Sequence, residues 1–401
     1  MLARLRFLGE NRDFQILLLG SAFFSLGFFM YNVLFTNFAA DEIEILPREL
    51  GILESIREIP GLLSVLIAAA TMFLLEPRLA GIALLLMAFG VTNYFHLDDV
   101  TGLVMFSLIW SIGFHSWAPV SLSLALRLGP KGQEGRRLGL LRSSGNVAGL
   151  LGIGIVFLFA TSTGMRPLFV VSGMLIAFGG LVIFRIRAPL ESHDQRIVLR
   201  RKYTLFYVLQ FLSGTRRHVF MTFALFALVR IHDTSIETIA ILSFVNQIGS
   251  IISAYTFGRW IDRHGEKPVL AWGFGGLTFV FLGYAFIDTP WILYILYVVD
   301  NILFNNSIAI STYVEKILVS PADLRPTMVT GQTMNHIAAV VVPVTGGLLW
   351  QAYGHALPFV AGAVVAAISV FVSLLITTGR MGPNVDAGGE SVPAAAAADS
   401  G

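Results

Sequence analysis

Apolar residues fill most of this chain in long runs, and short polar stretches separate the runs. A helix needs about 20 mostly apolar residues to cross the hydrocarbon core of a bilayer. Twelve runs approach or exceed this length and predict an all-α polytopic membrane protein with twelve transmembrane helices. The runs cover residues 14–39, 47–75, 79–95, 100–127, 136–160, 166–186, 203–230, 237–260, 268–287, 290–316, 326–352 and 355–378.

Composition supports the membrane interpretation and excludes several classes of function. Hydrophobic residues make up 55% of the 401 residues and charged residues only 13%, whereas soluble domains average about 25% charged residues. The chain has no cysteine, which excludes disulfides and thiolate metal ligands. It also has no phosphate-binding G-x-x-x-x-G-K-[ST] loop and no H-E-x-x-H sequence. We therefore expect no enzyme activity, no cofactor, no metal site and no nucleic-acid partner.

Positive charges are distributed unequally between the two sides of the membrane. With the N-terminus in the cytoplasm, 20 of the 27 Lys and Arg residues fall on cytoplasmic segments, 3 on outer loops and 4 within helices. Cytoplasmic loops carry such an excess, so both termini are predicted to be cytoplasmic, in the cell (plasma or inner) membrane. The basic N-terminus leads into the first apolar run without a small-residue cleavage site, which favours a retained helix over a signal peptide.

A charged stretch, residues 185–202, follows the sixth apolar run and divides the runs six and six. A charged loop at the midpoint is typical of a linker between two bundles. The predicted organisation is an N-terminal six-helix bundle, a cytoplasmic linker, a C-terminal six-helix bundle and a disordered tail of small residues. These parts cover residues 1–187, 188–202, 203–380 and 381–401 respectively.

The two halves also show weak internal similarity. A single offset of 189 residues places Ser64 on Ser253 and Asn146 on Asn335, and it aligns Gly51 with Ala240 at the start of matching apolar triplets. Internal repeats are common in transporter folds. We therefore predict that the two six-helix bundles are related by pseudo-symmetry.

The polar segment between the eighth and ninth runs, residues 258–268, reads GRWIDRHGEKP. Its pattern, G-x-x-x-D-R-x-G-x-K, resembles the cytoplasmic loop signature of the major facilitator superfamily of secondary transporters. The resemblance implies two bundles around a central cavity, transport by alternating access, and a monomer. The offset places residues 69–79 opposite this segment, where the motif is almost absent, so the first half is atypical. The resemblance assigns the role of a conformational latch to Gly258, Asp262, Arg263, Gly265 and Lys267.

The seventh run contains the strongest anomaly, Arg216-Arg217-His218, near its middle. A charge at mid-membrane costs about 2.5–3.5 kcal/mol even on the most lenient scale, so these side chains must face protein or water. Arg217 shares a helix face with Gln210 and Ser213. Its guanidinium suits a carboxylate or phosphate, which makes Arg217, assisted by Arg216, a candidate substrate-binding residue. Alternatively, one or both arginines pair with a membrane carboxylate and only join helices.

Other intramembrane polar residues are candidates for the same cavity. Asp300 in the tenth run is a proton site, a counter-ion for Arg217 or part of a structural pair, and Asn305 lies five residues further on. Asn32 and His115 are further substrate-binding candidates from the first and fourth runs. Coupling or ion-pair candidates from the second run are Glu54, Arg57 and Glu58, which share one helix face and can also pair with one another.

These observations support three functional hypotheses. The first is a secondary active transporter of a small organic anion bound by Arg217, with a proton or another ion as a possible coupling partner. The second is an exporter of amphipathic or cationic compounds, in which the carboxylates supply the charge and the arginines are structural. The third is a membrane sensor that transports nothing.

Overall fold

The computed structural model describes residues 11–129, 132–190, 199–320 and 323–377. Within these ranges the chain forms helices and no strand. The helices of the first half are α1 (Arg12–Asn37), η2 (Phe38–Glu42), α2 (Pro47–Leu62), α3 (Ser64–Ala70), α4 (Glu76–Thr92), η3 (Asn93–His96), α5 (Val100–Arg127), α6 (Glu134–Thr163) and α7 (Met165–Ile183).

A short 3-10 turn, η4 (Arg201–Tyr203), leads into the second half. Its further helices are α8 (Thr204–His232), α9 (Ile236–His264), α10 (Glu266–Phe286), α11 (Pro290–Leu303), η5 (Phe304–Ser307), α12 (Ile308–Ile317), α13 (Leu324–Tyr353) and α14 (Ala356–Ser373). The predicted tail, 381–401, lies outside the described residues.

The twelve apolar runs correspond to twelve helical segments in the described parts of the chain, which confirms the predicted fold class. By length and hydropathy, ten of these segments qualify as membrane spans. The two that do not are α2 with α3, and α8. These segments carry Glu54, Arg57 and Glu58, and Arg216 and Arg217, respectively. The charged side chains that lower the hydropathy of these two segments are therefore also the candidate functional residues.

Two segments predicted as continuous helices are interrupted in the structure. The second segment breaks at Leu63, between α2 and α3, shortly after Pro60. A proline in a helix removes one backbone hydrogen bond and clashes with the preceding turn. The tenth segment passes through the 3-10 turn η5, which contains Asn305 and Asn306. Asn side chains compete for backbone hydrogen bonds and weaken a helix interior.

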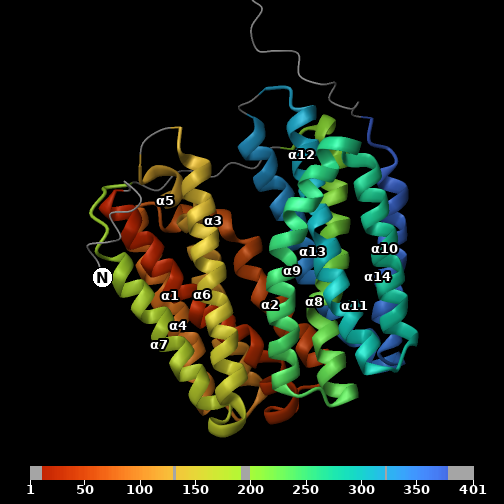
Figure 1. Ribbon diagram of the computed structural model, residues 1–401, viewed down its shortest axis with the longest axis horizontal. Helices are drawn as coiled ribbons and strands as arrows, with labels where there is room; N and C mark the ends of the chain where they lie inside the picture. The colour runs from red at the N-terminus through yellow and green to blue at the C-terminus, as the bar shows by residue number, and fades with distance from the viewer. Residues whose placement is uncertain (1–10, 130–131, 191–198, 321–322, 378–401) are drawn as a thin grey trace, which may run out of the picture.

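Figure 1 shows two groups of helices, α1–α7 and α8–α14, side by side. We call the end at which α1 begins and α14 ends the terminal end, and the other the opposite end. The two groups meet near the opposite end, at the bottom of Figure 1, and diverge toward the terminal end. None of the seven residues of α3, which lies toward the terminal end, is buried. The two groups of helices therefore contact each other at the opposite end and lie farther apart toward the terminal end.

Glycines allow the closest approach between the bundles. A Cβ atom added to Gly51 on α2 would lie 2.2 Å from the carbonyl oxygen of Pro343 on α13. One added to Gly347 on α13 would lie 2.5 Å from the carbonyl oxygen of Pro47. Nearby, the Ser55 hydroxyl accepts a hydrogen bond from the backbone N–H of Val344 at 3.0 Å. The backbones of α2 and α13 thus pack directly against each other near the opposite end.

Each bundle contains an ion pair with a buried carboxylate, at matching positions near the terminal end. In the first half, Glu76 at the start of α4 pairs with Arg127 at the end of α5 at 3.0 Å and accepts a hydrogen bond from Ser123. In the second half, Glu266 at the start of α10 pairs with Lys316 at the end of α12 at 2.6 Å. The cations are 189 residues apart and the carboxylates 190. The predicted offset therefore relates equivalent three-dimensional contacts.

Candidate functional site

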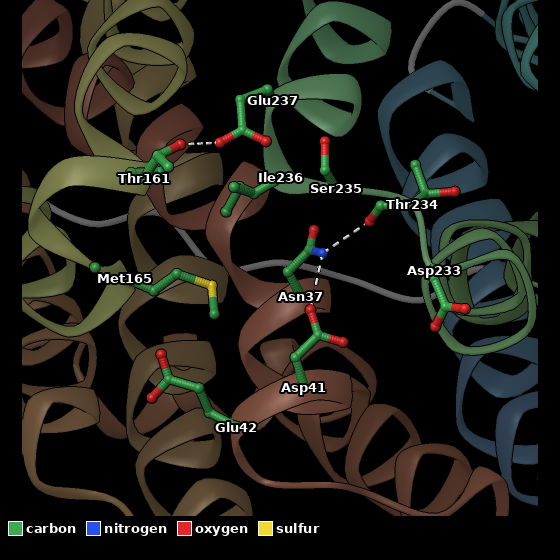
Figure 2. Close-up of a pocket in the computed structure, with 12 residues that line it drawn as sticks. Asn37, Asp41, Glu42, Thr161, Met165, Asp233, Thr234, Ser235, Ile236 and Glu237 are labelled. Atoms are coloured by element: carbon green, nitrogen blue, oxygen red, sulfur yellow. Dashed lines mark hydrogen bonds between the residues drawn. The ribbon is translucent and has the colours of Figure 1, made fainter.

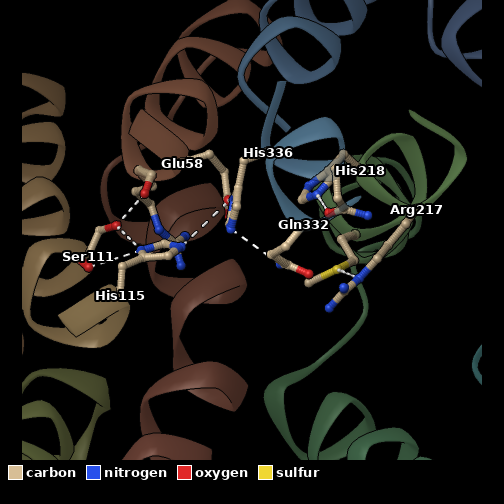
Figure 3. A network of polar contacts seen from close by, with 10 residues as sticks. Glu58, Ser111, His115, Arg217, His218, Gln332 and His336 are labelled. Atoms are coloured by element: carbon tan, nitrogen blue, oxygen red, sulfur yellow. Dashed lines mark hydrogen bonds and ion pairs between the residues drawn. The ribbon is translucent and has the colours of Figure 1, made fainter. Parts of the chain in front are cut away.

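A cluster of ionisable side chains lies midway along the helices where the two bundles touch. Glu58 on α2 and His115 on α5 come from the first bundle, and His336 on α13 comes from the second. The Glu58 carboxylate oxygen Oε2 lies 3.0 Å from His336 Nδ1 and 3.8 Å from His115 Nε2. Figure 3 shows the three side chains converging across the boundary between the bundles. We call these three residues the Glu58 cluster.

The two imidazole rings of the Glu58 cluster are held by further hydrogen bonds. His115 Nδ1 lies 3.0 Å from both the hydroxyl and the carbonyl oxygen of Ser111, one turn earlier on α5. His336 Nε2 lies 3.3 Å from the Gln332 side-chain nitrogen, one turn earlier on α13. The rings meet edge to face, with centroids 5.2 Å apart. Both rings are therefore oriented by residues of their own helix toward Glu58.

Arg216 and Asp300 form a buried ion pair between α8 and α11. Arg216 Nη1 donates to Asp300 Oδ1 at 2.9 Å, and the two residues are 0% and 4% exposed. The Nε and Nη2 atoms of Arg216 have no hydrogen-bond partner among the described residues. This contact pairs Asp300 with Arg216, whereas the sequence had suggested Arg217 as one partner for Asp300. It neutralises the charge of Arg216 inside the C-terminal bundle.

Arg217, the next residue, has different neighbours. Its Nε lies 3.1 Å from the sulfur of Met221, and its guanidinium stands over the Phe304 ring at 4.8 Å. No carboxylate of the described residues lies within ion-pair distance of it. In Figure 3 the Arg217 side chain lies at the edge of the polar network that contains the Glu58 cluster. Arg217 is therefore partly buried, and no carboxylate among the described residues contacts it to balance its charge.

Glu54 and Arg57 pair with each other on α2. The Arg57 guanidinium also lies over the rings of Phe35 and Trp110, at 4.8 and 4.6 Å. Cation–π contacts of this kind stabilise a buried guanidinium further. Of the three residues on this helix face that could pair with one another, Glu54 and Arg57 do so. Glu58 instead contacts the second bundle.

Two of the candidate amides make their hydrogen bonds elsewhere. Asn32 on α1 is exposed and donates to the Phe28 carbonyl of its own helix at 3.0 Å. Asn305 in η5 donates to the Ser253 hydroxyl on α9 at 2.6 Å. Asn305 therefore fastens the break in the tenth segment to its neighbour helix.

The segment with the signature motif is more helical than expected. The sequence suggested a loop over residues 258–268, but α9 continues to His264 and α10 starts at Glu266. The turn is the single residue Gly265, with φ of +81°, a conformation that glycine adopts without steric cost. Gly258 lies within α9 with no atom within 4 Å of an added Cβ. Asp262, Arg263 and Lys267 are exposed at the terminal end.

A second polar contact between the bundles joins α6 to α9. Gln247 Nε2 donates to Asn146 Oδ1 at 3.0 Å. The offset of 189 residues places Gln247 on Glu58, and it places Asn146 on Asn335, the neighbour of His336. The two contacts therefore join the corresponding pairs of helices, at positions that differ by one residue on α6 and α13. His336, Gln332 and Ser111 were not among the predicted site residues, although Gln332 and His336 are polar residues one turn apart in an apolar segment.

A cavity of about 460 Å³ lies at the opposite end of the bundles, away from the Glu58 cluster. Four carboxylate residues line it: Asp41, Glu42, Asp233 and Glu237. Within it, the Asn37 side chain donates to the Thr234 carbonyl at 3.1 Å, and the Thr161 hydroxyl donates to Glu237 (Figure 2). Both hydrogen bonds cross between the bundles, so they help to close this end.

Comparison with protein families gives a match over most of the chain. The family model described as Major Facilitator Superfamily matches residues 17–206 and again residues 206–398. Among curated proteins, the chain is similar to "Tetracycline resistance protein, class H" of Pasteurella multocida, with 27% identity over 125 residues. This match spans 31% of each chain, so the chain covers about a third of that relative's length.

Solved structures show the same fold at low sequence identity. The nucleoside transporter NupG (D323A mutant) superposes with a TM-score of 0.75 and 15% identity, over 92% of this chain and 100% of that one. A bacterial homologue of the human lysosomal transporter Spinster, in an inward-facing and unoccupied conformation, gives a TM-score of 0.70 and 13% identity. That match covers 91% of this chain and 97% of the other.

Proposed function

Because this chain belongs to the Major Facilitator Superfamily, we propose that it is a secondary active transporter that moves a small organic anion across the membrane by alternating access. The family and the fold indicate a multi-pass membrane transporter rather than an enzyme, and a transporter must bind a small-molecule substrate. The observation that carries the proposal is the difference between Arg216 and Arg217. Arg216 is neutralised by Asp300, whereas Arg217 contacts no carboxylate of the described residues.

An intramembrane cation without a counter-ion is energetically unfavourable, since a charge at the bilayer centre costs about 2.5–3.5 kcal/mol even by insertion scales. Binding of an anionic substrate group would recover part of this cost. A guanidinium offers several donors in a plane that matches carboxylate and phosphate. Gln332, on the neighbouring helix α13, offers an amide that can donate to or accept from a substrate.

A second candidate function is export of amphipathic or cationic compounds. The partial similarity to a tetracycline resistance protein favours it, as does a stack of aromatic rings in the first bundle. Phe28, Trp110 and Phe114 stack nearly parallel, with centroids 5.3 to 6.2 Å apart. In that case the arginines would serve only to hold helices, and the aromatic rings would contact the substrate.

For the transport cycle we propose that residues 1–187 and 203–380 rotate as two bundles joined by the linker at 188–202. The excess of Lys and Arg at the terminal end supports a cytoplasmic location for both termini in the cell membrane. The conformation described above is then open to the cytoplasm. Asp262 and Arg263, exposed in this conformation, would engage as a latch when the terminal end closes.

The test is a thermal-shift screen of the purified protein against organic carboxylates, organic phosphates, lipophilic cations and neutral amphiphiles. A ligand that binds only the native state raises the apparent stability. We expect anions to stabilise the wild type and the control variant Arg142→Ala, which removes an exposed arginine of α6. The same anions should not stabilise Arg217→Ala. If lipophilic cations stabilise all three proteins equally and anions stabilise none, the export function replaces this one.

A further inference from the structure

Hydrogen bonding between the helices does not by itself require the particular side chains of the Glu58 cluster. One carboxylate and two imidazoles each offer an atom, and the three atoms lie within 4.8 Å of one another. Imidazole and carboxylate together form the ligand set of many sites for divalent transition metals. We propose that Glu58, His115 and His336 form a binding site for a divalent transition-metal ion such as Zn²⁺, and that the bound ion joins the two bundles.

The distances fit a tetrahedral ion. Nitrogen and oxygen ligands lie about 2.0–2.2 Å from Zn²⁺, so two ligands of a tetrahedral site lie about 3.4 Å apart. The observed separations from Glu58 Oε2, 3.0 Å to His336 Nδ1 and 3.8 Å to His115 Nε2, lie on either side of this value. The third pair, His115 Nε2 and His336 Nδ1, lies within 4.8 Å, so the two rings would move toward each other by up to about 1.4 Å to place all three atoms on one ion.

Neighbouring residues present the correct ring atom of each histidine. A metal-binding imidazole usually has its second nitrogen held by a hydrogen bond, which fixes the ring orientation. Ser111 contacts Nδ1 of His115, so Nε2 faces Glu58. Gln332 contacts Nε2 of His336 through its side-chain amide, so Nδ1 faces Glu58. A metal-bound His336 donates from Nε2–H, so the Gln332 amide would then turn its oxygen rather than its nitrogen toward the ring. Two helices thus supply the supporting contacts that such a site needs.

The backbone also leaves room for both rings. Gly61, one turn after Glu58 on α2, faces the two imidazoles. A Cβ atom there would lie 2.4 Å from His336 Cε1 and 2.6 Å from His115 Nε2. The side chains of the cluster are 11 to 21% exposed, so an ion can reach them and water can fill a fourth position. Any side chain at residue 61 would displace the histidine rings.

The site has a conformational consequence because its ligands come from different bundles. Glu58 and His115 would move with the first bundle and His336 with the second. Rotation of the bundles toward closure at the terminal end would separate these ligands. A bound ion therefore stabilises the conformation closed at the opposite end and slows the transport cycle.

The first experiment measures Zn²⁺ binding to the purified, tag-free protein by isothermal titration calorimetry, with Mg²⁺ as the control ion because it prefers oxygen ligands. We expect one Zn²⁺ per chain and at least tenfold weaker binding in His336→Ala and Glu58→Gln. The control variant His218→Ala removes a nearby imidazole whose Nε2 lies 3.4 Å from Asn335 Oδ1 rather than in the cluster. It should bind Zn²⁺ like the wild type.

Equal Zn²⁺ affinity in the wild type and both cluster variants would overturn the proposal, as would no binding to the wild type. The visible absorption of Co²⁺ bound to the wild type gives a test that needs no variant of the cluster. A strong four-coordinate spectrum supports the site, and a weak six-coordinate spectrum contradicts it.

A second experiment measures the conformational effect. The chain has no native cysteine, so spin labels can be placed at Leu66→Cys on α3 and Ile252→Cys on α9, which are 64% and 63% exposed. Zn²⁺ should narrow the distribution of distances between the two labels to one population, which is that of the conformation open at the terminal end. The same labelled protein with His336→Ala should not respond. An unchanged wild-type distribution at saturating Zn²⁺ would show that the ion does not join the bundles.

Discussion

The α2–α13 and α6–α9 contacts occupy equivalent places in the two halves of the molecule but differ in chemistry. In the first, the Glu58 carboxylate lies 3.0 Å from a His336 nitrogen. In the second, two neutral amides, Gln247 and Asn146, meet at 3.0 Å. Hydrogen bonds between neutral groups contribute about 0.5–1.5 kcal/mol, and those to charged groups about 1.5–3 kcal/mol. Of these two midway contacts, the one between α2 and α13 is therefore the stronger, while α6 and α9 share a further hydrogen bond, Thr161 to Glu237, at the opposite end.

Glycine packing increases the asymmetry. Gly51 and Gly347 bring the backbones of α2 and α13 together, whereas Gly154 on α6 has no atom within 4 Å of an added Cβ. We infer that α2–α13 determines which conformation is populated and that α6–α9 allows the bundles to move. Three substitutions test this difference, each in the presence of EDTA so that no metal ion contributes.

The largest effect should come from Gly51→Val. Its Cβ would lie 2.2 Å from a backbone oxygen of α13, and a backbone atom cannot move away unless the helices separate. We expect the ratio of the conformation closed at the opposite end to the other conformation to fall further than in either of the two variants below. Spin-label distances between Leu46→Cys and Tyr353→Cys, at the start of α2 and the end of α13, should lengthen. Gly154→Val is the matched control, and an equal response in both variants would refute the asymmetry.

Glu58→Ala should have the second largest effect. Loss of about 1.5–3 kcal/mol lowers the ratio of the same conformation to the other about 10- to 150-fold. The same label pair measures this shift, and the elution volume on size exclusion confirms that the variant remains folded. A distance distribution like that of the wild type would show that the carboxylate–imidazole contact does not determine the conformation.

Gln247→Ala should have the smallest effect, a reduction of about 2- to 12-fold for the loss of about 0.5–1.5 kcal/mol. The comparison with Glu58→Ala in the same assay is the informative result. If both variants shift the population equally, the two contacts are energetically equivalent despite their chemistry, and α6–α9 must be treated as a second determinant of the conformation.

The sequence predicted the helical segments well because the length of an apolar run is a local property. It missed the breaks near Leu63 and at η5, where Pro60 and a pair of asparagines interrupt otherwise apolar segments. The buried pairs Glu76–Arg127 and Glu266–Lys316 could have been found, since the offset of 189 already aligned their cations.

The partners of the intramembrane charges could not be read from the sequence. Three carboxylates and several cations within the spans allow many pairings, and only the packing of the helices selects Arg216 for Asp300. The metal site that we propose could not be inferred from the sequence for the same reason. Glu58, His115 and His336 lie on three separate helices, and no sequence spacing relates residues that far apart in the chain.

The position of the Gly51–Pro343 contact near one end of the helices has a mechanical consequence. Helices such as α9, with 29 residues, are about 43 Å long. A rigid arm of this length that turns about a fulcrum at one end moves its free end by about 0.75 Å per degree. A rotation of a few degrees therefore produces several ångströms of travel at the other end, about the width of a small solute. Conversely, one methyl group added at the Gly51–Pro343 contact would change the spacing of the helices there, and the resulting displacement would increase with distance along the helix.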